Sequence, residues 1–261
     1  MKPATAFILP DQHYAPPSCK EGGVDPRAES CALQAIKIVK PDIFINLGDI
    51  IEAASISHWK YKKIKRPPLE YQLPPLNEEL ACGNAGLDRF DKELDAVGCN
   101  QRWYLGWNHC WTWLDDFVQA HTYLADNYAP PIAYKMRARG YKWKPYGEFL
   151  TIGKVAYYHG GHWTGINHTR DHAMRLGKSV VYGHTHDAQV SKVQHLDGAK
   201  GAWSMGTISL MDKPFLKGRP TNWSHNFGLC HYNADGSFHI EVIDIFNGAC
   251  WVYGQEIKAK V

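Results

Sequence analysis

The chain has 261 residues, a formal net charge of +3 and seven cysteines. The length fits one large layered domain better than two ordinary ones, and so mild a charge does not by itself indicate a nucleic-acid-binding protein. The cysteines include no C-x-x-C pair, so the sequence favours neither a disulfide framework nor a structural zinc knuckle.

No segment of the sequence is typical of export or membrane insertion. The apolar run at residues 4–9 ends at Pro10 and is too short for the apolar core of a signal peptide. No other segment approaches the roughly 18 uninterrupted apolar residues that a membrane-spanning helix needs. We therefore expect a protein of the reducing cytoplasm that makes no membrane contact. The oligomeric state is left open.

The N-terminal part of the chain alternates strands and helices. An apolar run at residues 5–9 predicts a buried strand, and residues 27–39 carry apolar side chains at helical spacing, ending before Pro41. A second apolar run at residues 43–47 predicts another buried strand. Strand, helix and strand in this order predict a right-handed crossover between parallel strands.

The alternation of strands and helices is interrupted between residues 57 and 98. Prolines and a basic cluster there precede a helical pattern at residues 87–97. We interpret residues 57–98 as an insertion within a single domain spanning 1–261, and we expect it to contribute to substrate selection. A third strand at residues 102–105 and a helix at 111–128 are predicted to follow.

The second half of the chain is rich in predicted strands. After a proline-rich and basic stretch at residues 129–146, strands are predicted at 148–152, 154–158, 179–182, 188–193 and 203–210, with a helix at 169–178. The turn Asn233-Ala234-Asp235-Gly236 then separates residues 229–232 from 238–245. This pattern predicts an antiparallel hairpin.

Polar residues recur where the predicted strands end. Such strand ends are where open α/β sheets place their ligand sites. The candidate ligands are Asp11, His13, Asp49, Asn108, His159, His184 and His186. Carboxylate and imidazole groups suit first-row divalent metals such as Mn, Fe, Zn or Ni, and these candidates exceed what one tetrahedral site requires. Two metal ions are the economical interpretation.

The order of these motifs resembles the calcineurin-like metallophosphoesterases, whose series runs D-x-H, G-D, G-N-H-(D/E), H and G-H-x-H. The corresponding residues here are Asp11-Gln12-His13, Gly48-Asp49, Gly106-Trp107-Asn108-His109, His159-Gly160 and Gly183-His184-Thr185-His186. The series spreads over about two thirds of the chain. The resemblance implies a four-layer α/β/β/α sandwich of two mixed sheets flanked by helices.

The resemblance also implies a function and a set of roles. The chain would be a phosphoric ester hydrolase with two divalent metal ions, manganese supporting its activity in vitro. Asp11, His13 and His186 would bind one ion, Asn108, His159 and His184 the other, and Asp49 would bridge them. A metal-bridging hydroxide would attack phosphorus. His109 would be the catalytic residue that protonates the leaving alkoxide or stabilises its charge.

Two positions depart from the family pattern. Trp107 stands between Gly106 and Asn108, and Cys110 follows His109 where the family has an acid. Because that acid orients the histidine, we expect its loss to affect the chemistry more than metal binding, unless Asp115 or Asp116 replaces it.

The other histidines carry weaker expectations. His162, three residues after His159, is a candidate for substrate contact, as is His225. His168 and His172 lie four residues apart on a predicted helix, and we expect them on the surface.

The substrate class remains open. Small phosphoesters or nucleotides are our first expectation. Two stretches that interleave aromatic and basic residues, 59–66 and 134–144, leave a DNA or RNA nuclease as an alternative, although solvated basic loops are the commoner explanation. A non-catalytic metal-binding scaffold is a further alternative, although no ligand of the motif series is missing.

Overall fold

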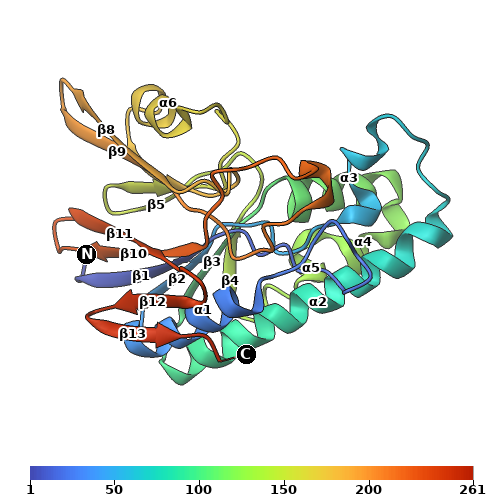
Figure 1. Cartoon of the computed structure of the whole chain (residues 1–261), viewed down its shortest axis with the longest axis horizontal. Coiled ribbons are helices and arrows are strands. Elements are labelled where there is room, and N and C mark those ends of the chain that lie inside the picture. The colour runs from blue at the N-terminus through green and yellow to red at the C-terminus, as the bar shows by residue number, and fades with distance from the viewer. Residues whose placement is uncertain (261) are drawn as a thin grey trace.

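Two mixed β-sheets pack face to face, and helices cover the outer face of each sheet (Figure 1). The computed structural model describes residues 1–260. Its architecture confirms the predicted α/β class with two mixed sheets flanked by helices. None of the helices within residues 1–260 combines the length and the hydrophobicity that crossing a bilayer requires.

The larger sheet has the strand order β11-β10-β1-β2-β3-β4. Strands β1 to β4 run parallel, and β10 and β11 continue the sheet antiparallel beyond β1. The bounds are Ala4–Leu9 (β1), Ile43–Asn46 (β2), Gln101–Leu105 (β3), Tyr141–Lys144 (β4), Asn226–Tyr232 (β10) and Phe238–Asp244 (β11). The predicted parallel pairing of the first two strands and the predicted C-terminal hairpin are both confirmed.

The smaller sheet has the order β5-β6-β7-β9-β8, in which β6, β7 and β9 are parallel. The bounds are Leu150–Ile152 (β5), Val155–Tyr157 (β6), Ser179–Tyr182 (β7), Gln189–His195 (β8) and Gly198–Ser204 (β9). A separate hairpin, β12 (Ala249–Val252) with β13 (Gln255–Lys258), packs beside helix α1 (Pro26–Val39).

Three apolar layers hold the sandwich together. Strand β1 shows why: Phe7 faces the α1 side of the larger sheet, and its neighbour Ile8 faces the smaller sheet, because successive side chains of a strand point to opposite faces. Both residues are fully buried. On the far side of the smaller sheet, Tyr182 packs against Ala173 of helix α6 (His168–Arg175).

Helix α1 follows its sequence signals closely. Asp25 caps its N-terminus by accepting hydrogen bonds from the backbone N–H groups of Arg27 (2.8 Å) and Ala28 (3.1 Å). Its C-terminus is at Lys40, whose φ of 49° is left-handed. The predicted helix at residues 27–39 is therefore confirmed.

Helix α2 (Leu69–Ala96) is much longer than the predicted helix at residues 87–97. Pro74 and Pro75 lie inside it, although each removes a backbone donor that a helix would use. An apolar stripe that continues past these prolines explains the difference, because its side chains are buried in the larger core cluster: Leu76, Leu80, Leu87, Phe90 and Leu94.

Three other expectations were wrong in extent. The basic stretch 129–146 was not expected to hold regular structure, yet it contains helix α5 (Pro130–Ala133) and the edge strand β4. The strand expected at residues 203–210 is β9 and ends at Ser204, and its apolar continuation is a buried loop. The helix expected at residues 111–128 is divided into a π-turn, α3 (Trp113–Ala120), a 3₁₀ turn and α4 (Ala125–Tyr128).

Candidate metal centre

Polar side chains from four loops meet where strands of both sheets end. The loops follow β1, β2, β6 and β7, and the C-terminal ends of parallel strands are where such sheets bind ligands. The cluster consists of Asp11, His13, Asp49, His159, His184 and His186. Each of these side chains is buried or half-buried.

The first group of potential ligands is Asp11, His13 and His186. Nε2 of His186 lies 3.1 Å from Asp11 Oδ2 and 3.1 Å from Nε2 of His13. Two ligand atoms that are each about 2.1 Å from one ion lie roughly 3.0–3.4 Å apart when adjacent and about 4.2 Å apart when opposite. The remaining separation, 4.0 Å between His13 Nε2 and Asp11 Oδ2, is close to the opposite arrangement. All three separations therefore suit ligands around one cation.

The second group is Asp49, His159 and His184. Nε2 of His159 lies 3.2 Å from Asp49 Oδ2 and 3.3 Å from Nδ1 of His184. Nδ1–H of His159 donates to the carbonyl oxygen of Leu47 at 2.8 Å, which leaves Nε2 as the nitrogen that faces the cluster. This group has the same adjacent-ligand spacing as the first.

Asp49 lies between the two groups. Besides its contact with His159, its Oδ2 atom is 3.9 Å from Nε2 of His13. Asp49 also belongs to a third group of ligand atoms, with His13 and His109, all within 4.8 Å of one another. A carboxylate placed between two cations would offset their mutual repulsion.

The ionisation of the cluster calls for positive charge at its centre. Burial opposes a charge on Asp49, but the nearby His159 imidazole holds the pKa of that carboxyl well below its usual range. Burial likewise opposes a charge on His159, yet Asp49 and Asp11 raise the pKa of that imidazole to about 9. Burial and the charge of His159 lower the pKa of His184 to about 3. Two buried carboxylates thus lie close together among imidazole rings, and a divalent cation between them would balance their charge.

The backbone of the cluster is strained. Left-handed φ angles are uncommon outside glycine and tend to gather at functional sites. Four cluster residues adopt them: His13 (52°), Asp49 (46°), His184 (70°) and His186 (57°). The loops therefore aim these side chains inward at a conformational cost that surrounding contacts must offset.

Two glycines make room for the cluster. A Cβ atom on Gly48 would lie 2.4 Å from the Leu105 carbonyl oxygen and 2.7 Å from Nδ1 of His159. A Cβ atom on Gly183 would lie 2.4 Å from Asp11 Oδ1. The glycine before Asp49 and the glycine before His184 are thus required by close packing around the ligand atoms.

Asn108 lies after β3, directly before His109, and provides a further test of fit. Its Oδ1 atom is buried and has no hydrogen-bond partner. Buried polar atoms normally have a hydrogen-bond partner, and an amide oxygen without one is suited to coordinate a cation. The chemistry of the donor set, carboxylate and amide oxygens with imidazole nitrogens, also fits first-row divalent ions. The residues present therefore fit a metal centre.

His109 stands beside the cluster and is oriented by Glu52. Its Nδ1–H donates to the Glu52 carbonyl oxygen at 2.6 Å, and Glu52 Oε1 lies 3.8 Å from the same nitrogen. Glu52 Oε2 is 3.1 Å from His13 Nδ1 and 3.2 Å from Lys213 Nζ. Burial opposes its charge, but the imidazoles and Lys213 lower the pKa of Glu52 to about 2. One buried carboxylate thus contacts both a candidate ligand and the candidate catalytic histidine.

The residues expected to replace the missing acid do not reach His109. Asp115 accepts a hydrogen bond from Gln119 at 2.8 Å, and Asp116 lies 3.5 Å from His58 Nε2. Sequence reasoning missed Glu52, which follows Asp49 by three residues within an apolar run. An acid at an otherwise apolar position next to a candidate ligand was the signal available.

Cys110 contacts the cluster from the other side. Its Sγ atom lies 3.7 Å from Asp49 Oδ1 and also contacts the Tyr104 hydroxyl. Burial and the charge of Asp49 raise the pKa of the thiol to about 12, so Cys110 is a neutral donor toward Asp49. Cys110 therefore contacts Asp49, and the residue that contacts His109 is Glu52.

Three of the other histidines lie elsewhere than expected. His225 lines a different cavity, where its Nε2 lies 2.8 Å from the Ser209 carbonyl oxygen. The expectation that His168 and His172 lie on the surface was wrong, because both are buried. Nδ1 of His168 lies 2.6 Å from the Tyr182 hydroxyl. The ring of His172 stacks on that of Tyr182, with the ring centroids 3.9 Å apart. Contacts with Tyr182 therefore accompany the burial of both histidines. His162 is exposed, with its ring 5.9 Å from that of Trp107.

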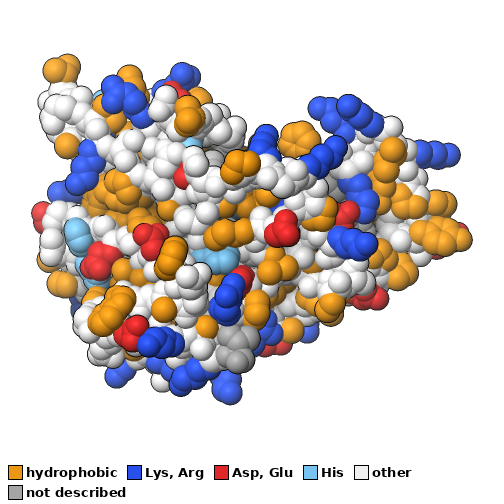
Figure 2. All heavy atoms as spheres, in the orientation of Figure 1, with side chains coloured by type: hydrophobic (Ala, Val, Ile, Leu, Met, Phe, Trp, Pro, Cys, Tyr) orange, Lys and Arg blue, Asp and Glu red, His pale blue; other side chains and the backbone are white. Residues whose placement is uncertain are grey.

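The two basic and aromatic stretches differ in exposure. Figure 2 shows Lys and Arg side chains gathered over the loop that precedes α2, where Lys62, Lys63 and Lys65 are exposed. In the 134–144 stretch, however, Tyr134 and Tyr141 are buried in the core. Arg139 in that stretch is likewise engaged, by ion pairs to two aspartates of α2. Two of the three aromatic rings of this stretch are thus unavailable for stacking on bases, and the third, Trp143, is half-buried.

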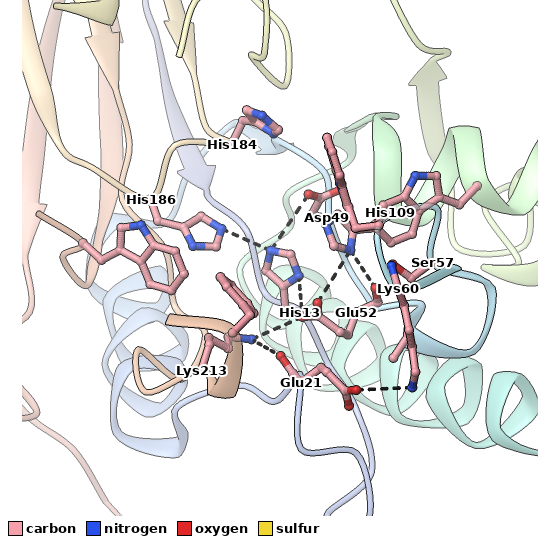
Figure 3. A pocket seen from close by; sticks show the side chains of 15 residues that line it. His13, Glu21, Asp49, Glu52, Ser57, Lys60, His109, His184, His186 and Lys213 are labelled. Carbon is pink, nitrogen blue, oxygen red and sulfur yellow. Dashed lines mark hydrogen bonds and ion pairs between the residues drawn. The ribbon is translucent and has the colours of Figure 1, made fainter. Parts of the chain in front are cut away.

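A cavity of about 590 Å³ opens onto the cluster (Figure 3). His109 lies on one side of it and His186 on the other, with His13 and Asp49 between them. The volume falls within the roughly 300–1,000 Å³ typical of small-molecule sites. The arrangement can hold cations at the floor of a pocket large enough for a small organic ligand.

No protein-family model matches the sequence, and no curated protein matches it. Two solved structures align with most of the chain. Yfce, a phosphoesterase from Escherichia coli, aligns at 13% identity and a TM-score of 0.40, covering 93% of this chain and 100% of its own. The Thermotoga maritima protein TM1076 aligns at 11% identity and a TM-score of 0.37, covering 94% and 99%. Likeness at this level leaves the function to be argued from the site.

Proposed function

We propose that this chain is a dinuclear metal-dependent hydrolase of phosphoric esters. Two groups of three potential ligands carry the proposal. Asp49 belongs to one group and lies close to the other, and both groups border a cavity that is also lined by His109. We assign Asp11, His13 and His186 to one ion, Asn108, His159 and His184 to the other, and Asp49 to both. Two divalent cations held there would activate water and withdraw charge from phosphoryl oxygens.

The protein's own groups supply the acid–base chemistry. The hydrogen bond from Nδ1–H of His109 to the Glu52 carbonyl oxygen leaves Nε2 as the nitrogen free to act. As an imidazolium, His109 donates the Nε2 proton to the departing alcohol oxygen. Glu52 fixes the ring orientation, and its carboxylate supports the imidazolium at 3.8 Å. Cys110 has no part in the proton transfer, since its thiol faces Asp49.

We propose manganese as the supporting metal, with iron, zinc or nickel as alternatives. The assigned ligands offer oxygen and nitrogen atoms and no thiolate, a set that several first-row ions accept. Small phosphoesters or nucleotides are the proposed substrates, because the cavity has the size of a small-molecule site. A cytoplasmic location stays a prediction, and the seven free thiols suit a reducing compartment.

The nuclease alternative has lost part of its support, because Tyr134 and Tyr141 of the 134–144 stretch are buried in the core. The loop at residues 59–66 remains the one exposed basic and aromatic stretch of the two, and it borders the cavity through Trp59 and Lys60. Hydrolysis of single- or double-stranded DNA that weakens steeply with salt would favour the nuclease. A scaffold without catalysis would bind metal and hydrolyse nothing.

One set of assays tests the proposal. Protein treated with EDTA is loaded with Mn²⁺, Zn²⁺, Ni²⁺, Fe²⁺ or Mg²⁺ and tested on p-nitrophenyl phosphate, bis-p-nitrophenyl phosphate and DNA. We expect no hydrolysis after EDTA and restored hydrolysis of one small ester with at least one ion, together with about two bound ions per chain. Failure of every ion to restore hydrolysis of any of these substrates would overturn the proposal.

A further inference from the structure

The cavity above the metal centre is walled by aromatic rings. Besides the histidines it is lined by Trp59, Trp113, Phe215 and Trp223. These rings come from the loop before α2, from α3 and from the loop before β10. Exposed aromatic residues are ordinary when scattered singly, but several facing one cavity indicate a binding surface.

Two of the rings are left exposed in the protein. Trp59 is 69% exposed and Phe215 is 60% exposed. Phe215 is held there by its neighbours, because Lys213 and Leu216 on either side are buried and Lys213 Nζ donates to the Glu21 carbonyl oxygen at 3.0 Å. An anchored turn that presents a phenyl ring to a pocket provides a flat apolar surface at little further entropic cost.

The rings stand on opposite sides of the metal centre. Trp113 packs on His109 with ring centroids 4.1 Å apart, and Trp59 directly precedes Lys60 on the same side of the cavity (Figure 3). On the other side, Trp223 lies 4.6 Å from His186 and 6.2 Å from Phe215. A ligand whose phosphoryl group reached the metal centre would therefore meet an aromatic wall on either side.

The lysines that line the cavity are already paired with carboxylates, so the metal centre is the part of the site that would bind a phosphoryl group. Lys60 Nζ lies 3.2 Å from Glu21 Oε1, and Lys213 Nζ lies 3.2 Å from Glu52 Oε2. Both lysines that line the cavity are thus paired with carboxylates. The remaining lining has no uncompensated cation to hold further phosphates of a polyanion. Its recognition chemistry is therefore stacking.

Resting on the proposed function, we propose that this cavity selects phosphoesters that carry a flat heteroaromatic ring, of the size of one nucleotide, through a subsite formed by Trp59, Phe215 and Trp223. Base stacking on aromatic side chains tolerates any base, because every base presents a π-face. The subsite should therefore distinguish esters with a ring from esters without one, and should distinguish poorly among bases. Trp59 would be the contribution of the 57–98 segment to substrate selection.

The test compares substrates that share a reacting centre. Adenosine 5′-monophosphate is compared with ribose 5-phosphate, and adenosine 5′-(methyl phosphate) with ribose 5-(methyl phosphate), on the metal-loaded protein. In the pair that the protein cleaves, we expect kcat/KM for the ring-bearing ester to be roughly tenfold higher, mainly through KM, as stacking of one base would give. The ratio should fall toward one in Trp59→Ala and in Phe215→Ala.

Matched controls exist among exposed aromatic residues outside this cavity. Trp251 is 61% exposed and Phe246 is 79% exposed, and neither lines this cavity. Trp251→Ala and Phe246→Ala should leave both the ratio and the rates unchanged. Because a ratio is measured, a general loss of folded protein affects both esters equally. Equal kcat/KM values in the unmodified protein, or a preference that survives both cavity substitutions, would overturn the subsite.

A binding measurement separates this proposal from the hydrolase proposal. Titration of adenosine monophosphate into the protein should change tryptophan fluorescence at a lower concentration than ribose 5-phosphate, and Trp59→Ala should abolish that difference. If neither pair is cleaved with any ion while the binding difference persists, the hydrolase proposal fails and the ring subsite stands. If the ring-free esters are cleaved and the binding difference is absent, the subsite fails and the hydrolase stands.

Discussion

Nδ1–H of His109 donates to the backbone carbonyl oxygen of Glu52 at 2.6 Å, and the carboxylate of the same residue lies 3.1 Å from Nδ1 of His13. Glu52 therefore orients a candidate metal ligand through its side chain and a candidate catalytic histidine through its backbone. A carboxylate behind a ligand histidine fixes the ring and increases its basicity.

Replacing His109 separates chemistry from metal binding. We expect His109→Ala to lower kcat about 100-fold, the lower end of what general acid catalysis contributes, and to leave two metals bound. Steady-state kinetics and elemental analysis of the purified variant measure the two quantities. His239→Ala, at an exposed histidine that does not line the cavity, is the matched control and should change neither. Loss of a metal from the His109 variant would show that this histidine is a ligand.

Replacing Glu52 tests its role in positioning. Glu52→Gln should lower activity or metal affinity roughly 10- to 100-fold, as removal of an orienting carboxylate does elsewhere. Steady-state kinetics and elemental analysis measure the two quantities. Glu241→Gln, which changes a carboxylate that does not line the cavity, serves as the control. Unchanged activity together with unchanged metal content in the Glu52 variant would contradict the assigned role.

Replacing Asp49 tests the bridging assignment. Asp49→Asn keeps the shape of the side chain and removes the charge between the two ligand groups, so we expect fewer than two metals per chain and loss of activity. Added Mn²⁺ should also raise the melting temperature of this variant less than that of the unmodified protein, because a ligand stabilises in proportion to its affinity. Asp126→Asn, on an exposed helix, is the control. Full metal content in Asp49→Asn would contradict the assignment.

Glu79 gives the protein a pH-dependent stability. Burial raises the pKa of this α2 carboxyl to about 7, although the backbone N–H groups of Ala54 and Ser55 donate to it. The folded state thus binds the proton more tightly than the unfolded state, whose pKa is near 4.5. Stability must therefore fall as pH rises from about 4.5 through 7, by roughly 3 kcal/mol.

Glu79→Gln should remove this loss. The free energy of unfolding of the variant should rise relative to that of the unmodified protein as pH rises from about 4.5 to 8. Urea unfolding at a series of pH values measures the difference. Parallel stability curves across this range would show that the carboxyl is ionised throughout.

Sequence alone anticipated the parts of the fold that depend on short-range signals. The apolar runs of β1 and β2 and the stop before Pro41 each express a local preference, and each was placed correctly. The candidate ligands on these loops were expected together because parallel strands end at one edge, and the structure brings six of them into one cluster.

Features that depend on tertiary contacts were missed. Pro74 and Pro75 predict a loop, and burial of the apolar α2 stripe in the core explains why that segment is helical. Likewise, a histidine on a short helix is expected at the surface, and the burial of His168 is explained only by its contact with the Tyr182 hydroxyl. The only local signal for Glu52 is an acid within an apolar run, and its partners His109 and Lys213 are far away in the sequence.

The left-handed backbone at His13, Asp49, His184 and His186 has a consequence for protein engineering. Copying only the six side chains onto another α/β scaffold would not reproduce the centre, because ordinary loops would direct them elsewhere. A transplant would have to carry the turns themselves, with Gly48 and Gly183 in place. A transplanted centre must therefore reproduce the loop conformations as well as the ligand residues, because the conformations determine where the ligands point.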